Sequence, residues 1–455
     1  MTLEERIADL ERRLAEALRK VDALQQENTR LRKELEEWKR GHRERRKRRS
    51  SRAEGRRKSE PKKPGRKAGH PGAFRKVPKP DRTEVHPMPE RCTCGGHVSA
   101  TGENDSTIVQ DIPAPRVENV EHVAPVGQCE RCGARVVAPL PGAVSNGQSV
   151  CDVQVGPNAQ GLILQLRFDG RMSLGCIAST CHTWFGLEVS KGGLSQLIDR
   201  LRDRTCEGYQ EVVDHVRGSA VVGLDETGLR QNGLSGWVWL ARTDQASLFR
   251  VELSRGSWVA EAILGKGFVG VVCSDFYAVY TARGDWRHAY CWAHTIRESR
   301  KVAEVDPGLW TLSFRDELSA WYAEGIVAQR RGRIVERDAA REHLRDLIEN
   351  RPVWEHPDVK RLCLRLEEHF DGVTAFLDNR SIPATNNATE RDVRAITAMR
   401  KVTGGTRSTN GSRSLAHWMT VTQTLRKNGL SLRDYVVESW VAHLHGRAPP
   451  SVFAN

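Results

Sequence analysis

The sequence predicts a multidomain protein of the α+β class. Its 455 residues exceed what one ordinary hydrophobic core holds, so two to four domains are expected. Apolar segments with strand character crowd the region from about 216 to 276, whereas helical periodicity dominates before and after it. A hydrophobic content of 38% with 12 Trp residues favours folded domains over a disordered chain.

Hydropathy and cysteine content also indicate the cellular compartment in which the protein is expected. The sequence has no run of eighteen apolar residues, so no membrane span is expected, and its charged, periodic N-terminus differs from a signal peptide. Eleven Cys residues are an odd number, and four of them form close pairs. This pattern fits a metal site in a reducing compartment better than a disulfide framework, so we expect a cytoplasmic protein.

The N-terminal residues 1–38 carry a heptad repeat and predict a coiled coil that pairs two chains. The β-branched residues of the repeat and one buried Asn favour a parallel homodimer. A single amphipathic helix packed on its own domain is the alternative. One seam consists of Leu3, Leu10, Ala17, Leu24, Leu31 and Trp38, and the other of Ile7, Leu14, Val21, Asn28 and Leu35.

Residues 39–80 predict a basic, extended linker that binds DNA. The net charge of the chain is +13, and Arg and Lys crowd the stretch 39–67. Such clustering indicates a polyanionic partner, most often nucleic acid, and a solvated disordered tail is the alternative. The following stretch KPGRKAGHPG is suited to lay basic side chains along a minor groove.

Residues 81–150 predict a zinc-ribbon-like knuckle. The motifs CTCGGH and CERCGA supply a C-x-C pair and a C-x-x-C pair, with a strand-rich segment between them. Two short knuckles of this kind suit a tetrahedral structural zinc ion held by four thiolates. His97 could replace one Cys, and reduced cysteines that bind no metal are the alternative. The expected ligands are Cys92, Cys94, Cys129 and Cys132.

Residues 151–215 predict a helical module that resembles a helix-turn-helix. Apolar periodicity gives helices at about 158–168, 173–186 and 190–204, with Gly186 at the end of the second. Two short helices joined by a Gly-containing turn are typical of such a motif. Any three-helix connector would give the same pattern, so both interpretations stay open.

The next region predicts strands and helices in the order β-β-β-α-β, with an acidic residue at the end of the first and fourth strands. The five segments read SAVVGLDETG, GWVWLART, SLFRVELS, SWVAEAILGKG and FVGVVCSDF. From about 300 to 380 the pattern is helical and charged. A helix that carries Glu390 and a last helix ending at Gly429 follow, and residues 431–455 are expected to form a C-terminal tail.

The two strand-end carboxylates, Asp225 and Asp275, are candidate metal ligands. Sites in α/β sheets form beyond the strand ends, where neighbouring carboxylates repel each other unless a cation lies between them. Oxygen ligands select Mg²⁺ or Mn²⁺, and a third carboxylate, Glu390, would complete a two-metal site. Each Asp could instead be an ordinary turn residue, and Glu226 could replace Asp225 as the ligand.

Glu390 also has a local interpretation. It stands three residues after Asn387 at the start of a helical pattern, which is the spacing of a capping box. Arg394, four residues on, would add an ordinary ion pair. The residue is therefore either half of a helix cap or a ligand, and the stretch IPATNNATERDVRAIT alone favours the cap.

Several long motifs resemble one known family. They are GLDETG, GWVWLART, CSDFYAVY, YCWAHTIRESRK, TNNATERDVRAITAMRKVTGG and NGSRSLAHWMTVTQTLRKNGLS. Together with the zipper, the PGRKAGHPG segment and the cysteine pairs, these motifs are similar to transposases of the insertion sequence 66 family, of the TnpC type. The similarity extends over nearly the whole chain.

The resemblance implies a DDE transposase with a ribonuclease-H-like catalytic domain over 216–430. Asp225, Asp275 and Glu390 match the acidic triad, and about 300–380 matches the helical insertion. The implied activity is Mg²⁺-dependent (or Mn²⁺-dependent) cleavage and strand transfer of DNA, with two metal ions. The implied partners are the transposon ends, target DNA, a second copy of the chain and accessory transposition proteins. An inactive DNA-binding regulator and a structure-specific nuclease are the alternatives.

Basic residues around the triad are candidate DNA contacts. Cys291 and His294 are three residues apart, but two ligands are too few for a closed metal site. The alternatives for these residues are a helix start with buried side chains and a solvated basic face. The residues expected to hold DNA are His294, Arg297, Arg391, Arg394, Arg400 and Lys401.

Overall fold

The computed structural model describes residues 77–113, 115–138, 153–282, 285–305, 307–349 and 357–454, together with Lys20, Gln25, Gln26 and Thr29. Its contacts divide the chain into two units, Met1–Gln110 and Asp111–Asn455, and each is described by itself. The predicted coiled coil over 1–38, apart from those four residues, and the basic linker up to residue 76 lie outside the described residues.

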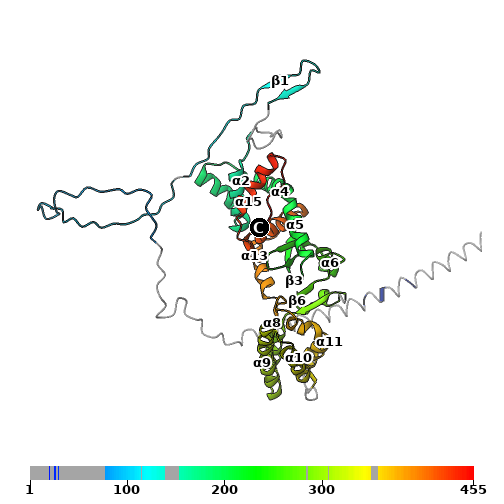
Figure 1. Cartoon of the computed structure of the whole chain (residues 1–455). Coiled ribbons are helices and arrows are strands. Elements are labelled where there is room, and N and C mark those ends of the chain that lie inside the picture. Colours follow the sequence, from blue (N-terminus) through cyan, green and yellow to red (C-terminus); the bar gives the residue numbers. More distant parts are fainter. Residues whose placement is uncertain are drawn as a thin grey trace, which may run out of the picture. The chain divides into compact units, whose positions relative to one another are not determined.

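A five-stranded mixed sheet forms the centre of the second unit (Figure 1). The predicted order of three strands, a helix and a fourth strand is confirmed, and a short fifth strand is added. The strands lie in the order β5-β4-β3-β6-β7, in which β3, β4 and β5 are antiparallel and β6 and β7 continue parallel to β3. Their bounds are β3 (Val221–Gln231), β4 (Leu234–Arg242), β5 (Ser247–Glu252), α6 (Ser257–Leu264), β6 (Val271–Ser274) and β7 (Arg287–Tyr290).

The helices before the sheet share its core. The predicted helix end at Gly186 and the helix start at residue 190 are confirmed: Gly186 adopts a left-handed conformation with φ 67°, and the Ser190 hydroxyl, which caps α4, accepts from the Gly193 amide at 3.0 Å. Two of the predicted helices end in a π-helical turn. These elements are α2 (Pro157–Leu164), η1 (Gln165–Asp169), α3 (Leu174–Thr180), η2 (Cys181–Phe185), α4 (Lys191–Arg204) and α5 (Cys206–Arg217).

The last helices return to the same core, so the predicted C-terminal tail over 431–455 is wrong. There α15 (Leu432–Leu444) packs against α2, with Tyr435 and Trp440 buried. One cluster of buried residues runs from Ile163 to Val452, so no packing boundary separates the helical module from the sheet. The other two helices are α13 (Asn387–Thr403) and α14 (Thr409–Lys427), which packs on β5.

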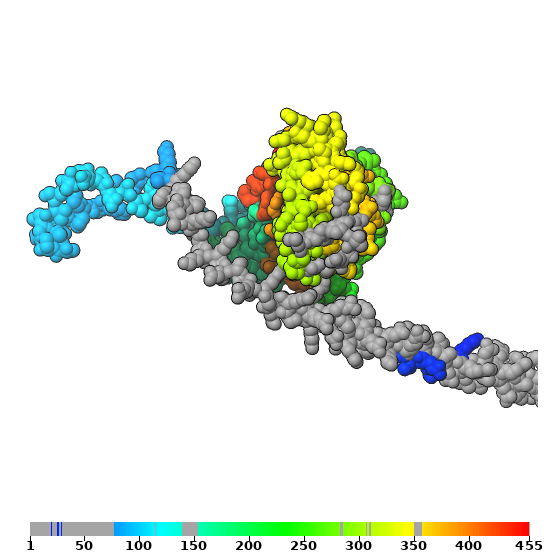
Figure 2. Space-filling view, turned by 90° about the horizontal axis from the view of Figure 1, so that it is seen from below, coloured from blue at the N-terminus to red at the C-terminus, as the bar shows by residue number. Residues whose placement is uncertain are grey.

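The predicted helical insertion has its own core at the other end of the sheet. Trp292 and Trp321 lie 4.4 Å apart between ring centroids and anchor this second cluster. Figure 2 shows its surface coloured from yellow-green to yellow. None of the described helices is both long and apolar enough to cross a membrane. The insertion consists of α8 (Trp292–Val305), α9 (Leu309–Arg331), α10 (Ile334–Glu349), α11 (Pro357–Glu368), α12 (Phe370–Thr374) and η3 (Ala375–Leu377); α7 (Ala278–Thr281) lies between β6 and β7.

Candidate active site

The sheet register brings Asp225 and Asp275 side by side. In the parallel pairing of β3 with β6, Val221 faces Val271 and Gly223 faces Cys273. Asp225 is two residues beyond Gly223 in β3, and Asp275 is two residues beyond Cys273, just after β6 ends. The two carboxylates are near enough for the charge of Asp275 to raise the pKa of Asp225.

Asp225 does not lie at a strand end, as the sequence predicted. It lies inside β3, which continues to Gln231 against β4. Its neighbour β6, however, ends at Ser274, so the parallel part of the sheet stops one residue before Asp275. The candidate site therefore lies at the C-terminal end of β6, and Asp275 directly follows that strand.

Helix α13 docks on this face of the sheet and carries Glu390. The Asn386 amide group donates to the Leu224 carbonyl at 2.8 Å, and the Asn386 backbone amide donates to the Cys291 sulfur at 3.0 Å. A Cβ atom built on Gly223 would lie 2.1 Å from Thr389 Oγ1. The glycine therefore permits the close approach that sets Glu390, in the first turn of α13, near the two aspartates.

Gly223→Ala should accordingly push α13 away from β3. Overpacking of this kind costs about 1 to 3 kcal/mol, and the loss should be visible in urea denaturation. Gly267→Ala is the matched control, because a Cβ there meets no atom within 4 Å. Adding Thr389→Ala should recover part of the loss. Unchanged stability of the single variant would show that the contact is not tight.

The predicted capping box at Asn387 and Glu390 is wrong. The N-cap is Asn386, one residue earlier, and its side chain is occupied by the Leu224 carbonyl instead of the helix amides. Glu390 is therefore one position too far along the helix for a box. Its Oε1 atom is buried without a hydrogen-bond partner and lies 3.7 Å from His294 Nε2. The side chain is aimed at the site and not at the backbone.

The carboxylates influence one another electrostatically. The pKa of Asp225 rises from its ordinary value of 3.8 to about 7, mainly because the side chain is buried, and the negative charges of Glu226, Asp275 and Glu390 raise it further. A hydrogen bond from the Glu226 amide to Asp225 Oδ1, at 2.9 Å, opposes this rise. Three carboxylates gathered in a half-buried site form an environment that favours a cation.

The donor set fits a hard divalent cation such as Mg²⁺. All three carboxylates supply oxygen ligands, and the unpartnered Glu390 Oε1 lacks the donor that such a buried atom requires. Across the described ranges, no three His, Cys, Asp or Glu side chains are already gathered closely enough to hold a metal ion. The three carboxylates are thus near neighbours and not a closed cage.

Glu226, the alternative ligand, has another role. Arg255 donates to Glu226 Oε1 from both Nε (3.1 Å) and Nη2 (2.6 Å), and the Tyr280 hydroxyl donates to Oε2. The Arg255 guanidinium lies over the rings of Trp237 and Tyr277, 4.3 and 3.9 Å from their centroids. Glu226 therefore ties the segment that follows Asp275 to β3, on the face opposite Asp225.

The predicted DNA contacts divide into three groups. His294, on α8, is half-buried beside Glu390, and Arg297 is exposed one turn further along. Cys291, which precedes α8, is buried and bound by the Asn386 amide, which is a structural role. Arg400 differs from the prediction, because its guanidinium donates to Thr227 Oγ1 and the Gly228 carbonyl and so fixes α13 to β3.

The remaining predicted basic residues line a groove of about 560 Å³ on the outer side of α13. Asp392 is the acidic residue of this lining, and its carboxylate is paired with Lys427 at 2.7 Å. The groove is therefore strongly positive. Its cations are Arg391, Arg394 and Lys401, joined by Arg171 and Arg426, which the sequence did not single out. Arg171 has φ 58°, a conformation that is uncommon for a residue other than Gly, and no sequence signal marks it.

Each cysteine pair forms a tight turn. The Cys92 amide donates to the Gly96 carbonyl at 2.9 Å, and the Cys129 amide to the Ala134 carbonyl at 2.8 Å. Hydrogen bonds from the backbone and side chain of the second cysteine in each pair lower the pKa of the Cys92 and Cys129 thiols. Cys92 and Cys94 belong to the first unit, and Cys129 and Cys132 to the second. The four-ligand site and the place of His97 in it remain predictions.

A family model and one curated protein match parts of this chain. The family model described as Transposase IS66 family matches residues 152–414, more than half of the chain. A protein of Sinorhizobium fredii (strain NBRC 101917 / NGR234), named Uncharacterized protein y4jO, is 27% identical over 192 residues. That match includes 41% of this chain and 57% of the relative, so the chain spans little more than half the length of that protein.

Proposed function

The chain belongs to the IS66 family of transposases, and we propose that it is a DDE transposase that binds the ends of its element, cuts the DNA there and joins it to a target. The observation that carries this proposal is the convergence of Asp225, Asp275 and Glu390 from two strands and one helix. In this proposal the domain over 216–430 is ribonuclease-H-like. The antiparallel strands β3 to β5, extended by parallel β6 and β7, support that assignment.

The three carboxylates would hold the divalent ions of the reaction. Two such ions, when bound, activate the attacking oxygen and stabilise the charge that develops on the phosphate. In this proposal Asp225 and Asp275 would hold the ions from the sheet side, and Glu390 would bind from the helix. Water attacks the phosphorus atom and the P–O bond breaks, which leaves a 3′-hydroxyl. That hydroxyl then attacks a phosphorus atom of the target and expels another 3′-oxygen.

The chain's own side chains position the DNA for these steps. His294 stands beside Glu390, where its ring can donate to a non-bridging phosphate oxygen once protonated. The groove of Arg391, Arg394 and Lys401 lies on the same helix as Glu390, and in this proposal the DNA that occupies it continues to the carboxylates. Phosphate contacts of this kind fix register without reading sequence.

Removing these contacts should weaken DNA binding in a salt-dependent way. We expect Arg391→Gln combined with Arg394→Gln to lower the slope of log K against log salt by about 1 for each phosphate that is no longer neutralised. Fluorescence anisotropy with a terminal DNA duplex at several salt concentrations measures this slope. Arg333→Gln, on the 77% exposed Arg333 side chain, is the control. An unchanged slope would remove the groove from the DNA path.

Two further parts of the proposal concern assembly. The coiled coil over 1–38 would pair two chains, and the basic linker and helical module would bind the element's ends. A structural zinc ion would join the cysteine pairs, supported by the turn geometry and the lowered thiol pKa values. One equivalent of zinc per chain in the purified protein is the expected content, and its absence would contradict the knuckle.

A strand-transfer assay tests the function as a whole. The purified chain is incubated with Mg²⁺, DNA of the element's ends and a plasmid target. Joined products require attack by a DNA hydroxyl, so they distinguish a transposase from a nuclease, which would yield cut DNA alone. Bound but uncut DNA would instead indicate an inactive regulator. The proposal requires joined products that disappear when EDTA removes the divalent cation.

A further inference from the structure

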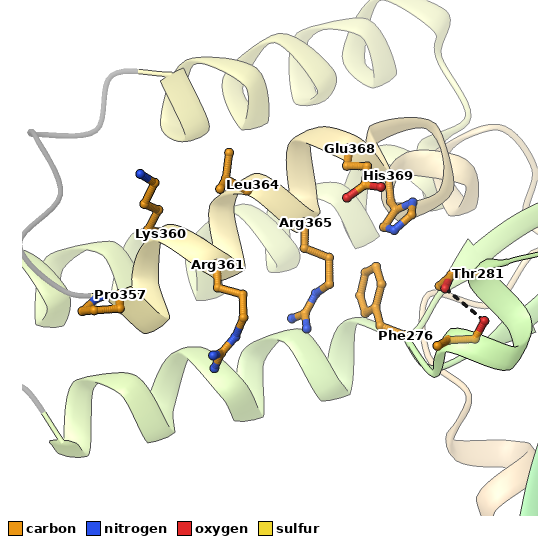
Figure 3. A pocket seen from close by; sticks show the side chains of 10 residues that line it. Phe276, Thr281, Pro357, Lys360, Arg361, Leu364, Arg365, Glu368 and His369 are labelled. Carbon is orange, nitrogen blue, oxygen red and sulfur yellow. Dashed lines mark hydrogen bonds between the residues drawn. The ribbon is translucent and has the colours of Figure 1, made fainter. Parts of the chain in front are cut away.

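A second hollow lies next to Asp275, between the insertion and the sheet. Its volume is about 570 Å³, within the range of about 300 to 1,000 Å³ that holds small ligands. Phe276, the residue directly after Asp275, forms one part of its lining, and the adjoining part is α11 (Figure 3). The hollow therefore opens beside the proposed catalytic carboxylates, although none of the three belongs to its lining.

The Phe276 wall is a rigid aromatic surface. Its ring stacks on Tyr290 with centroids 4.3 Å apart, and Tyr290 in turn stacks on His288 at 5.4 Å. His369 lies 5.8 Å from the Phe276 ring. The guanidinium of Arg365 lies over Phe276 at 4.5 Å and is held there by an ion pair with Glu298. Tyr290 therefore covers one face of the Phe276 ring and Arg365 the other, so a flat ligand would stack on the Arg365 guanidinium, which Phe276 and Glu298 hold in place.

The α11 wall is positively charged. Residues on the buried side of this helix, such as Val359, Leu362 and Leu366, pack into the insertion core. The side that lines the hollow presents Lys360, Arg361 and Arg365, with Glu368 as the acidic residue of the lining. In Figure 3, Arg361 and Arg365 extend from the same side of α11, with Arg365 the nearer of the two to the Phe276 ring. The hollow thus combines planes for an aromatic ring with cations for a phosphate.

We propose that this hollow binds one unpaired nucleotide of the substrate DNA. Its base stacks on the outer face of the Arg365 guanidinium, which Phe276 supports from the other side, and its phosphate is bound by Arg361. The inference rests on the proposed function, because Phe276 adjoins Asp275. The hollow is far too small for a duplex, and a base inside a duplex cannot stack on a side chain, so the nucleotide must leave its helix. The stacking surface accepts any base.

Three duplexes test this proposal in a binding assay at one salt concentration. The first is fully paired, the second has one unpaired adenine beside the cleavage position, and the third has an unpaired abasic nucleotide there. Stacking of a base is worth roughly a tenfold or greater gain in affinity, so the adenine duplex should bind about tenfold more tightly than the abasic one. The abasic duplex controls for flexibility. Basic segments that bind all three duplexes equally cancel in the comparison.

Matched variants test whether Phe276 and Arg361 are responsible for the tighter binding of unpaired DNA. Phe276→Leu keeps an apolar side chain and should reduce the preference for adenine over the abasic nucleotide to about twofold or less. Trp258→Leu, at an aromatic side chain of α6 that is 49% exposed, should keep it. Arg361→Gln should weaken binding of both unpaired duplexes several-fold, whereas Arg333→Gln should not. Arg361, on α11, and Arg333, which directly precedes α10, are both exposed and each pair with an acidic residue three positions away.

The outcomes separate this inference from the proposed function. Equal binding of the adenine and abasic duplexes by the wild type, or an undiminished preference in Phe276→Leu, overturns the nucleotide pocket. Strand transfer measured in parallel then still supports the transposase. A preference for adenine that depends on Phe276, without any DNA cleavage, supports the pocket and overturns the proposed function.

Discussion

Asp275→Asn is expected to reduce DNA cleavage by about a thousandfold or more while the chain still folds and binds DNA. The substitution keeps the size of the side chain and removes the negative charge that would hold a divalent ion beside Asp225. Loss of a metal ligand removes several kcal/mol of stabilisation from the transition state, and each 1.36 kcal/mol is a factor of ten in rate. Single-turnover cleavage of an end duplex, with anisotropy for binding, measures both quantities.

Two further variants distinguish a ligand from a structural residue. Asp244→Asn makes the same substitution just after β4 of the same sheet, at a side chain that is 95% exposed, and should leave cleavage unchanged. Asp275→Cys should be inactive with Mg²⁺ and regain part of its activity with Mn²⁺, because a thiolate is a softer ligand than a carboxylate. Full activity of Asp275→Asn would remove this residue from the site.

Local patterns in the sequence predicted strands β3 to β6 and the two aspartates that belong to the candidate site. The strands β3 to β6 are apolar runs bounded by turns, and their order follows from that pattern alone. Ser190 and Gly186 are caps whose chemistry is local. Asp225 and Asp275 were predicted to lie close together because each of them follows an apolar run that has the character of a strand. These features need no knowledge of distant contacts.

The features that were missed depend on tertiary contacts. Strand β7 has only four residues, and its pairing with β6 defines it more than its composition does. The choice of Asn386 over Asn387 as the N-cap depends on the Leu224 carbonyl, which is distant in sequence. Gly223 lies in neither a turn nor a positive-φ conformation, so only the close approach of α13 explains why a glycine is needed there.

One omission was avoidable. The segment after Gly429 begins with Ser431, whose hydroxyl accepts from the Asp434 amide and caps α15. Ser followed three residues later by an acid is a recognisable helix start, but the Gly that ends α14 was interpreted as the end of the domain. Nothing comparable marks Arg171 or Arg426, because a groove formed by three separate elements has no local pattern.

Asp225→Asn is expected to stabilise the folded chain in buffer without divalent cations, by roughly 4 kcal/mol at most at pH 8. The folded pKa of Asp225, about 7, is above its ordinary value of 3.8. Below pH 4 the carboxyl group is protonated in both the folded and the unfolded chain, so it does not change the free energy of unfolding. Between pH 4 and 7 the unfolded chain releases this proton and the folded chain keeps it, so the free energy of unfolding falls by about 1.4 kcal/mol per pH unit.

Urea denaturation of the wild type and the variant in EDTA, from pH 5 to 8, measures this difference. The gap should widen as the pH rises and stay near its maximum above pH 7, whereas Asp244→Asn should show no such trend. Adding Mg²⁺ should close the gap by stabilising only the wild type, because binding to the folded state alone raises stability. A gap that does not depend on pH would mean that neither burial nor the neighbouring carboxylates raise the pKa of Asp225 in the folded chain. The charge that weakens the empty fold is the same charge that would hold the ions needed for DNA cleavage, so stability and activity should respond to Asp225 in opposite directions.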